Sequence, residues 1–363
     1  MNVAIVYDRV NKWGGAERVL LELNKIFPDA PLYTSLYSPN KASWANVFKV
    51  ETSFLQKLKF LRDKHEVLGV LMPIAFESFD FSKFDLVISV TSEAAKGILT
   101  LPHTKHVCIC LTPTRYLWSD YEKYFNNSLF KIISYPAVLY LKFWEKIAIK
   151  RPDGVIAISE NIKEKISKYY GVNSTVIYPP ASSILDMKKI TFPKDKDYFL
   201  VVSRLVPYKR IDIVVEAATK LNVPLIVIGR GVEGKELKKI SGKNVKFKEF
   251  VSDDLLRGYY RNAKALIYPS DEDFGIGMVE AQIHGLPVIA FNKGAAKEIV
   301  IEGKTGTLFK EQSVISLIGK LKNFSKDRYN EKDCYDNGMR FSNLVFRNKL
   351  KSYIDDIIIN SNI

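Results

Sequence analysis

The fold class of this chain is decided by residues 268–289, which read YPSDEDFGIGMVEAQIHGLPVI. An apolar run, AKALIYP, leads into this stretch and predicts a buried strand. A helix is predicted next, and it ends at 285–287, GLP, before a further buried strand that begins at 288. A strand, a turn, a helix and a second strand in this order indicate an α/β domain with a parallel sheet.

Two glutamates, Glu272 and Glu280, stand on either side of the step at which that helix is predicted to begin. Open α/β sheets bind ligands at such crossings from strand to helix, and the first N–H groups of a helix attract phosphate. The pair could hold hydroxyl groups at two ends of one ligand, which suits a nucleotide sugar. Spacing alone is weak evidence, because a glutamate near a helix start often only compensates the helix dipole.

Length and composition favour a globular protein of two domains. The chain has 363 residues, of which 47% are hydrophobic, enough for two cores of ordinary size. It starts with a buried-strand pattern, so we expect no signal peptide, and the apolar run 132–141 is too short to span a bilayer. Its three cysteines lack the spacing of metal ligands. We therefore expect a cytoplasmic protein without a metal site.

The formal net charge of +14 is large. Such a charge favours anionic partners in general, namely nucleotide diphosphates, acidic lipid headgroups or nucleic acids. A solvated, lysine-rich surface explains the charge equally well, so charge alone selects no partner.

Strand-like runs alternate with amphipathic helical segments from end to end, which predicts parallel sheets covered on both faces. The segment 179–193 has prolines at both ends and no sustained period, so we interpret it as a linker. The prediction is two doubly wound domains, 1–182 and 190–343, with a final helix in 344–363 that returns to the first. The predicted strands are 3–8, 84–90, 106–111, 154–159 and 174–180, then 198–205, 223–231, 244–251, 263–269 and 286–291.

Two cations, Arg204 and Lys209, follow the first predicted strand of the second half and precede a helix. Because a helix start prefers acidic groups, cations there indicate an anionic ligand. A diphosphate fits, with arginine giving bidentate contacts and lysine a point charge. Gly229 and Gly231 at the next crossing would let backbone approach a ligand closely. The alternative is two solvated surface cations.

In the first half, Gly14 and Gly15 lie between the first predicted strand and the first helix. They would permit a tight turn and open backbone amides to a ligand, or serve only as a helix cap. The sequence contains no Gly-x-Ser-x-Gly elbow, no Walker loop and no complete Gly-x-Gly-x-x-Gly fingerprint. Hydrolase, kinase and dehydrogenase interpretations are therefore disfavoured.

Taken together, these motifs resemble those of the retaining glycosyltransferases of family 4, and most closely the mannosyltransferase-like members of bacterial surface-polysaccharide pathways. The resemblance covers nearly the whole chain and implies the GT-B fold, with two Rossmann-like domains facing a cleft and a C-terminal helix that crosses back. The motifs occur in family order: GGAE at 14–17, TPTRYLW at 112–118, RPDGVIAIS at 151–159, SRLVPYKR at 203–210, GRG at 229–231 and EDFGIGMVE at 272–280.

The resemblance implies three catalytic residues. Arg204 and Lys209 would bind the donor diphosphate and stabilise its charge as it leaves, and Glu272 would contact the donor sugar. Glu280 would hold the ribose hydroxyls, and the segment near Val251 would border the base. The implied donor-binding residues are Gly14, Gly15, Gly229, Gly231, Val251, Phe274, Gly275, Ile276 and Glu280.

The resemblance places the acceptor or sugar pocket at Leu111, Thr112, Arg115 and Tyr116. Family members usually have histidine before this Thr-Pro pair, and this chain has Leu111. We expect Leu111 to form an apolar wall of the pocket. The chain differs from the family pattern at a second place, the segment 294–298, which reads GAAKE. Family members usually have Gly-Gly before this glutamate.

Two segments of the first half predict contact with a membrane. Residues 53–68 mix phenylalanine and leucines with four cations, and residues 129–150 add aromatics and lysines. An apolar stripe bordered by cations is typical of a helix at a lipid interface. A helix that packs its apolar face on the core fits equally well. In the family, such elements face the membrane that carries a lipid-linked acceptor, so we expect peripheral contact with the inner face of the cytoplasmic membrane.

The leading hypothesis is transfer of mannose from GDP-mannose to a glycan or lipid-linked acceptor in polysaccharide synthesis, with retained configuration. It needs no cofactor besides the nucleotide sugar and no divalent metal, because cations and helix amides would stabilise the leaving diphosphate. One alternative is a UDP-hexose donor. Another is a catalytically silent nucleotide-sugar-binding subunit, suggested by Leu111. A nucleic-acid-binding protein would use the charge but leave the paired glutamates unexplained.

Overall fold

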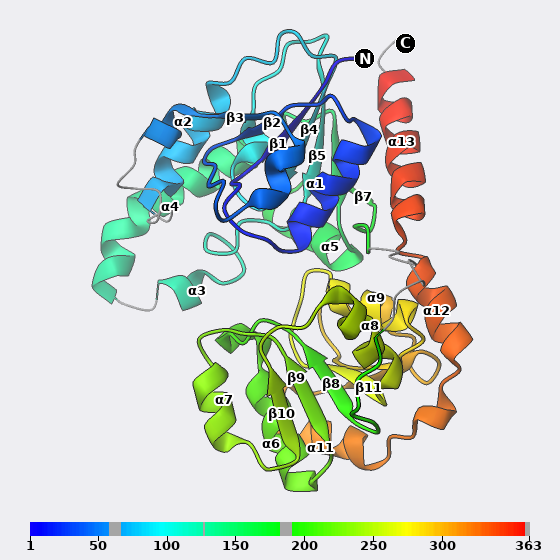
Figure 1. The fold of residues 1–363 in the computed structure, drawn as a ribbon. Helices are drawn as coiled ribbons and strands as arrows, with labels where there is room; N and C mark the ends of the chain where they lie inside the picture. Colours follow the sequence, from blue (N-terminus) through cyan, green and yellow to red (C-terminus); the bar gives the residue numbers. More distant parts are fainter. Residues whose placement is uncertain (58–66, 126–127, 182–190, 360–363) are drawn as a thin grey trace. The chain divides into compact units, whose positions relative to one another are not determined.

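The computed structural model describes residues 1–57, 67–125, 128–181 and 191–359, and the chain divides into two compact units (Figure 1). The first unit comprises Met1–Pro180 and Leu344–Ile363, and the second comprises Ala181–Asn343. The boundaries expected from the sequence, 1–182 with 344–363 and 190–343, differ from these only near the linker. Most of the predicted linker lies outside the described residues.

The first unit contains a sheet of seven parallel strands in the order β3-β2-β1-β4-β5-β6-β7. The order reverses between β1 and β4, which makes this pair the topological switch point of the sheet. The strands are β1 Val3–Tyr7, β2 Leu32–Thr34, β3 Val50–Thr52, β4 Leu86–Thr91, β5 Lys105–Cys110, β6 Gly154–Ala157 and β7 Thr175–Val176.

The final helix, α13 Asn343–Ile359, packs on this first unit, as the sequence predicted. Arg347 on α13 pairs with the buried carboxylate of Glu22, and the Tyr353 hydroxyl lies 3.5 Å from the Val155 carbonyl oxygen. The other helices of the unit are α1 Gly15–Ile26, α2 Met72–Glu77, α3 Tyr121–Tyr124, α4 Ser128–Ala148 and α5 Glu160–Tyr170, with 3₁₀ turns η1 Ser43–Val47, η2 Phe54–Lys57, η4 Val67–Leu71 and η5 Ala95–Gly97.

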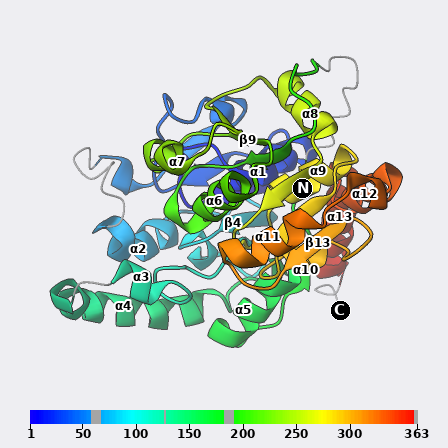
Figure 2. The same ribbon diagram turned by 90° about the horizontal axis from the view of Figure 1, so that it is seen from below.

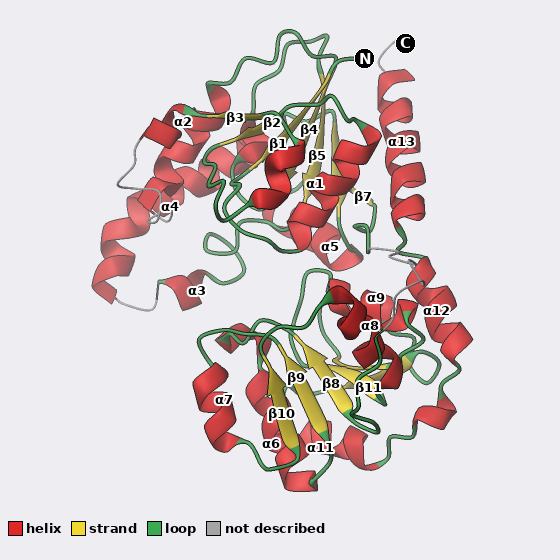
Figure 3. Ribbon diagram, viewed as in Figure 1, coloured by secondary structure: helices red, strands yellow, loops and turns green. Residues whose placement is uncertain are grey.

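The second unit contains a sheet of six parallel strands in the order β10-β9-β8-β11-β12-β13, which reverses between β8 and β11 (Figure 3). The strands are β8 Phe199–Val202, β9 Leu225–Ile228, β10 Val245–Lys248, β11 Ala265–Tyr268, β12 Val288–Phe291 and β13 Gly306–Phe309. The helices are η6 Pro207–Lys209, α6 Ile211–Leu221, α7 Gly234–Ile240, α8 Asp253–Asn262, α9 Ile276–Ile283, α10 Ala296–Ile299, α11 Val314–Lys322, η7 Lys326–Arg328 and α12 Glu331–Met339.

Helices flank the strands of each unit, so the central strands are apolar along their whole length (Figure 2). In the second unit, Val201, Val227 and Ile267 from three neighbouring strands pack into one core with Ile213 of α6 and Leu317 of α11. Three strands were not predicted, namely β2, β3 and β13. β2 and β3 have only three residues each, and β13 begins with Gly306 and Thr307, so none of them shows the apolar run on which the other predictions depend.

His106 is a buried titratable group in the first sheet. Its Nε2 lies 2.8 Å from the Ser89 hydroxyl on the neighbouring strand β4. Burial lowers the pKa of His106 from its usual 6.5 to about 3. As the pH falls below 6.5, the unfolded chain takes up a proton at this residue before the folded chain does. Stability is therefore lost progressively between about pH 6.5 and pH 3.

We predict that His106→Gln shows a shallower loss of stability with acid than the natural chain. One proton bound only by the unfolded state costs about 1.4 kcal/mol per pH unit. Urea unfolding between pH 6.5 and pH 4.5 measures this slope, and glutamine keeps a polar partner for Ser89. Identical slopes for the two proteins would show that His106 does not titrate on unfolding.

Candidate functional site

The predicted donor site lies at the carboxyl edge of the second sheet, where the strand order reverses. β8 ends at Val202 and β11 ends at Tyr268, and these two strands are neighbours. The segments that follow them, 203–210 and 269–275, contain Arg204, Lys209 and Glu272. Such a switch point is where open α/β sheets bind ligands.

Lys209 and Glu272 form an ion pair at this edge. The ammonium group of Lys209 contacts Oε1 of Glu272, and the two side chains are only 11% and 16% exposed. Lys209 ends the short turn η6, which begins with Pro207 and is followed by Arg210 at a positive φ of 53°. The turn therefore directs the Lys209 side chain inward, just before helix α6 begins.

Tyr208 links the two predicted phosphate-binding cations. The exposed Arg204 donates a hydrogen bond of 2.5 Å to the Tyr208 hydroxyl, and the Lys209 ammonium lies 5.4 Å from the centre of the Tyr208 ring. The sequence analysis included Tyr208 in a motif but gave it no role. Its position directly before Lys209 is the feature of the sequence that could have indicated this role.

Glu280 lies on α9, about one turn inside the helix as predicted. The Tyr260 hydroxyl donates a hydrogen bond of 3.2 Å to Glu280 Oε2, and the Tyr260 ring stacks on His284 at 5.3 Å. His284 Nδ1 lies 2.8 Å from the Glu280 carbonyl oxygen, and burial lowers the pKa of His284 below its usual value. The sequence analysis missed Tyr260, which orients the carboxylate from α8.

Tyr268 is a buried residue beside the ion pair, with the Lys209 ammonium 5.8 Å from the centre of its ring. Burial raises the pKa of its phenol well above the usual value, and the negative charges of Glu272 and Glu280 add to that rise. The phenol thus lies next to Lys209 and in the electrostatic field of both glutamates. The sequence analysis missed Tyr268, the last residue of a buried strand.

Gly275 begins α9 with a φ of 91°, a conformation that favours glycine. A Cβ there would lie 2.5 Å from the terminal carbon of Met278. The N–H groups of Ile276 and the residue after it open the helix, where an anion is stabilised. Phe274 is buried and packs on Phe341 at 5.6 Å, so its side chain serves the core.

Gly229 and Gly231 have a packing role that the sequence analysis did not foresee. A Cβ on Gly229 would lie 1.8 Å from the Ser203 carbonyl oxygen, and one on Gly231 would lie 2.1 Å from the Leu205 carbonyl oxygen. The two glycines therefore let the segment after β9 press against the backbone on either side of Arg204. Val251 lies in the loop before α8, after the edge strand β10.

The segment 294–298 holds the main chain of Glu272. Gly294 has a φ of 61°, and its Cβ would lie 2.4 Å from the Glu272 carbonyl oxygen. The N–H of Ala295 donates a hydrogen bond of 3.1 Å to that oxygen. The close backbone contact thus needs glycine at 294 but accepts alanine at 295.

In the first unit, Gly14 caps α1 in an extended conformation. A Cβ there would lie 3.1 Å from Glu17 Oε2. Glu17 is buried, accepts a hydrogen bond of 3.0 Å from the Tyr7 hydroxyl, and has its pKa raised by burial. Gly14 therefore leaves room for a buried carboxylate, while Gly15 is exposed at the start of the helix.

Asp8 organises the switch point of the first sheet, and the sequence analysis missed it. Its carboxylate accepts hydrogen bonds of 2.7–3.0 Å from four consecutive N–H groups, those of residues 92–95, and one of 2.9 Å from the Thr91 hydroxyl. Its position directly after the buried strand β1 is the feature of the sequence that could have indicated this role. The carboxylate fills the amide cluster at this edge, which would otherwise attract an anion.

The segment 112–118, where the acceptor pocket is predicted, is hydrogen-bonded to the buried carboxylate of Glu145 on α4. That carboxylate accepts hydrogen bonds from the Thr114 hydroxyl, from Trp118 Nε1 at 2.7 Å and from the Tyr170 hydroxyl at 2.9 Å, and it pairs with the buried Lys96. Glu145 could not be singled out from the sequence, because its partners come from three separate parts of the chain, namely Lys96, the segment 112–118 and Tyr170.

The residues of the predicted acceptor pocket lie along this attached segment. Leu111 is half-buried and donates its N–H to the Thr91 carbonyl oxygen at 2.8 Å, and Thr112 is buried. Arg115 and Tyr116 are partly exposed. Burial raises the pKa of the Tyr116 phenol well above its usual value, and Glu93 adds to the rise. Glu93 itself pairs with Arg9.

We predict that Glu145→Gln lowers the unfolding free energy by about 3–5 kcal/mol, because it leaves the buried Lys96 ammonium without a counter-charge. Lys96→Met combined with Glu145→Gln should recover much of that loss, since the amide oxygen still accepts hydrogen bonds. Urea unfolding measures both variants. A double variant no more stable than the single one would refute the unpaired-charge explanation.

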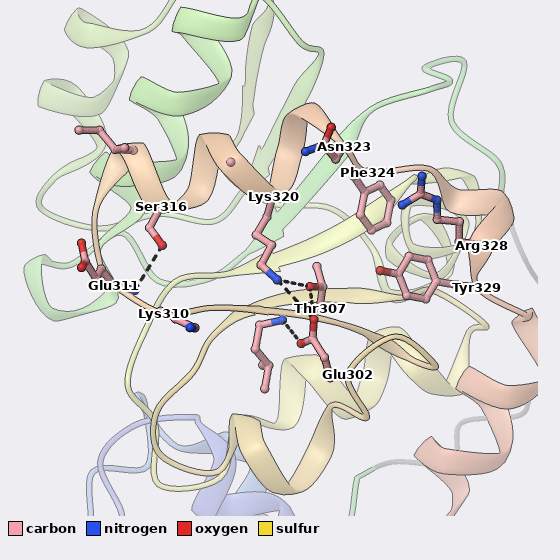
Figure 4. Close-up of a pocket in the computed structure, with 13 residues that line it drawn as sticks. Glu302, Thr307, Lys310, Glu311, Ser316, Lys320, Asn323, Phe324, Arg328 and Tyr329 are labelled. Carbon is pink, nitrogen blue, oxygen red and sulfur yellow. Dashed lines mark hydrogen bonds and ion pairs between the residues drawn. The ribbon is translucent and has the colours of Figure 1, made fainter.

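A separate cavity of about 740 Å³ lies in the second unit beside β13, α11 and η7 (Figure 4). The Lys320 ammonium donates to the Thr307 hydroxyl at 2.9 Å and lies 3.3 Å from Glu302 Oε1. The Phe324 and Tyr329 rings stack at 5.3 Å. None of the predicted site residues is among the described residues that line it. The cavity is therefore distinct from the predicted donor site.

Within residues 1–57, 67–125, 128–181 and 191–359, no three histidine, cysteine, aspartate or glutamate side chains come together as a metal ion would require. No helix in those ranges is both long and apolar enough to cross a membrane.

One family model matches most of the second unit. The family model described as glycosyl transferases group 1 matches residues 183–341. An uncharacterized glycosyltransferase, MJ1178 of Methanocaldococcus jannaschii, is 28% identical over 207 residues, 55% of this chain and 58% of the relative. The O-antigen chain mannosyltransferase RfbU of Salmonella typhimurium is 30% identical over 175 residues, 46% of this chain and 49% of the relative. The chain thus spans about half the length of the curated relatives it matches.

Comparison with solved structures confirms the GT-B fold predicted from the sequence. HepE of Anabaena in complex with UDP superposes with a TM-score of 0.71 at 19% identity, over 98% of this chain and 100% of that one. The lipopolysaccharide outer core galactosyltransferase WaaB gives a TM-score of 0.68 at 19% identity, over 98% and 99% of the two chains. At these identities the likeness establishes the fold.

Proposed function

We propose that this chain, whose residues 183–341 belong to the group 1 glycosyl transferases, moves a sugar from a nucleotide donor to a glycan or lipid-linked acceptor. The reaction would retain the anomeric configuration and serve cell-surface polysaccharide synthesis. The observation that carries this proposal is the ion pair of Lys209 with Glu272 beside Tyr268, at the switch point of the sheet in the matched segment.

In the proposed mechanism, Arg204 and Lys209 bind the donor diphosphate, and the first N–H groups of α9 add to the positive field. These groups stabilise the charge that develops as the diphosphate leaves. Glu272 contacts the transferred sugar and Glu280 the ribose hydroxyls. The leaving phosphate takes the acceptor proton, so no separate carboxylate base is required. Because cations on the chain supply the charge, we also propose that turnover needs no divalent metal.

We propose GDP-mannose as the donor, because one of the matched relatives is a mannosyltransferase. A UDP-hexose is the second candidate, since solved structures with the same fold are complexes with UDP and UDP-glucose. The acceptor would contact Arg115 and Tyr116 in the segment attached to Glu145. Leu111 would form an apolar wall there, and turnover by the natural chain would exclude a catalytically silent subunit.

We predict that Glu272→Ala and Glu280→Ala have different effects. Glu272→Ala should reduce turnover without weakening the binding of a free nucleoside diphosphate, because that ligand lacks the transferred sugar. Glu280→Ala should weaken binding of donor and diphosphate alike, by roughly 1–3 kcal/mol if the ribose hydroxyls lose their partner. Calorimetric titration and initial-rate measurements separate the two effects.

The donor itself is identified first by a thermal-shift panel of GDP-, UDP- and ADP-sugars with the natural chain. A ligand at a hundredfold excess over its dissociation constant stabilises the fold by about 2.7 kcal/mol. Equal losses of diphosphate affinity in the two glutamate variants would show that their roles are assigned wrongly. A panel without any stabilising nucleotide sugar would refute the proposed function.

We also propose that the first unit touches the inner face of the cytoplasmic membrane through α4. This helix packs Val138, Leu141 and Trp144 inward, yet much of its remaining surface is apolar and exposed. The exposed large residues are Ile132, Ile133, Tyr135, Leu139, Tyr140, Phe143 and Ile147. Lys131, Lys142 and Lys146 lie on the same helix, a combination typical of binding to anionic lipid surfaces.

The other predicted membrane segment, 53–68, contributes less. Residues 58–66 lie outside the described residues, Phe54 is 43% exposed and Leu55 is fully buried. The proposal therefore rests on α4.

We predict that replacing Ile132 and Phe143 by glutamate abolishes sedimentation with vesicles that contain anionic lipid. The change removes two of the most exposed apolar side chains of α4 and adds charge that the vesicle surface repels. Ile315→Glu is the matched control, because Ile315 is 83% exposed on α11 of the second unit. Unchanged sedimentation of the α4 variant, or equal loss in the control, would refute the proposal.

A further inference from the structure

We infer that Glu272 weakens the binding of the free nucleoside diphosphate product, because its carboxylate competes with that product for Lys209. The inference rests on the proposed function, since it takes Lys209 as a ligand of the donor diphosphate. It adds a second role to Glu272, namely discrimination between the intact donor and the spent nucleotide.

The competition follows from the ion pair. The Lys209 side chain is only 11% exposed, and the Glu272 carboxylate supplies its counter-charge. The aromatic faces of Tyr208 and Tyr268 are the other groups placed near the ammonium, at 5.4 and 5.8 Å from their ring centres. A cation at this depth requires an anion close by. In the absence of a nucleotide, Glu272 thus occupies the place of a phosphate oxygen beside Lys209.

The glutamate cannot withdraw as a whole when a phosphate arrives. Its main chain is held by the Ala295 N–H at 3.1 Å and by the close passage of Gly294. Only the side chain can exchange, so its carboxylate stays near the incoming diphosphate. Two anions at short range repel each other unless one of them gains a new partner.

The intact donor offers that partner, and the product does not. With the donor bound, the released carboxylate can accept hydrogen bonds from hydroxyls of the sugar. Once the sugar has been transferred, the diphosphate no longer carries sugar hydroxyls on its outer phosphate, and the carboxylate returns to Lys209. The exchange therefore favours binding of donor over product and assists product release, a step that limits turnover in many enzymes.

Arg204 differs from Lys209 in this respect. Its guanidinium donates to the neutral hydroxyl of Tyr208 at 2.5 Å. A phosphate that binds Arg204 displaces a phenol and no carboxylate. The competition is consequently specific to Lys209, and neutralising Glu272 removes it.

The test is calorimetric titration of GDP, UDP and inorganic pyrophosphate into the natural chain and Glu272→Gln, in 0.15 M salt. Glutamine keeps the size of the side chain and removes its charge. We expect Glu272→Gln to bind pyrophosphate about tenfold more tightly than the natural chain does. The same gain is expected for GDP or UDP, whichever of the two the natural chain binds better. Turnover of the donor should fall in the same variant.

Asp271→Asn is the matched control. Asp271 neighbours Glu272 in the chain, but its carboxylate lies 3.3 Å from Lys293 and not at Lys209. The substitution changes the net charge by the same amount, so long-range attraction of the anion rises equally. We expect less than about a twofold change in affinity, because such attraction is screened at this salt concentration.

A double-mutant cycle completes the test. In a Lys209→Met background, Glu272→Gln should no longer tighten binding, because the competition requires both partners. Unchanged or weaker binding by Glu272→Gln, or equal tightening by Asp271→Asn, would overturn this inference and leave the proposed function intact. Failure of the natural chain and Glu272→Gln to bind any nucleotide or nucleotide sugar would overturn the proposed function, and this inference with it.

Discussion

Hydrogen bonding between parallel strands is the constraint on which the candidate site depends. It places the carboxyl ends of all strands of a sheet at one edge, and the strand order then decides which segments meet there. Because β8 pairs directly with β11, the segment that carries Lys209 faces the segment that carries Glu272, although the two are distant in sequence. The pairing of β1 with β4 brings Asp8 to the turn after β4 in the same way. Side-chain chemistry at both edges follows from strand order.

The carboxylates of Asp8, Glu145 and Glu272 are all buried or half-buried, but they differ in the number of hydrogen-bond donors around them. A carboxylate with many donors is fixed in the structure, and one with a single partner can exchange it for a ligand. Asp8 accepts from four consecutive N–H groups and a hydroxyl, and Glu145 accepts from three side chains while pairing with Lys96. Removing either carboxylate from its donors would leave several polar groups unsatisfied. Glu272 contacts one cation at the rim of its sheet. A ligand that supplies an anion to Lys209 and hydroxyls to Glu272 can replace that single contact at little cost.

The sequence predicted the fold class and the return of the last helix, because buried parallel strands and amphipathic helices leave strong periodic patterns. It also predicted that Lys209 and Glu272 would lie together, since the motifs mark strand ends. It could not predict which side chains surround them. Tyr268 looks like any other buried residue of a strand, and its surroundings depend on the turn at Gly275 and on the packing of α9. Long-range partners such as those of Glu145 leave no local pattern.

The glycines of the second unit explain why side-chain exchange at Lys209 can be selective. Gly229, Gly231 and Gly294 each allow one backbone segment to press against another, next to Arg204 or Glu272. Larger residues would push these segments apart, so the glycines allow the main chain at Arg204 and at Glu272 to be held closely. At Glu272 the side chain is then the part that can turn away from Lys209. A site in which only the side chains reorganise can respond to the chemical difference between a sugar diphosphate and a free diphosphate without a change of fold.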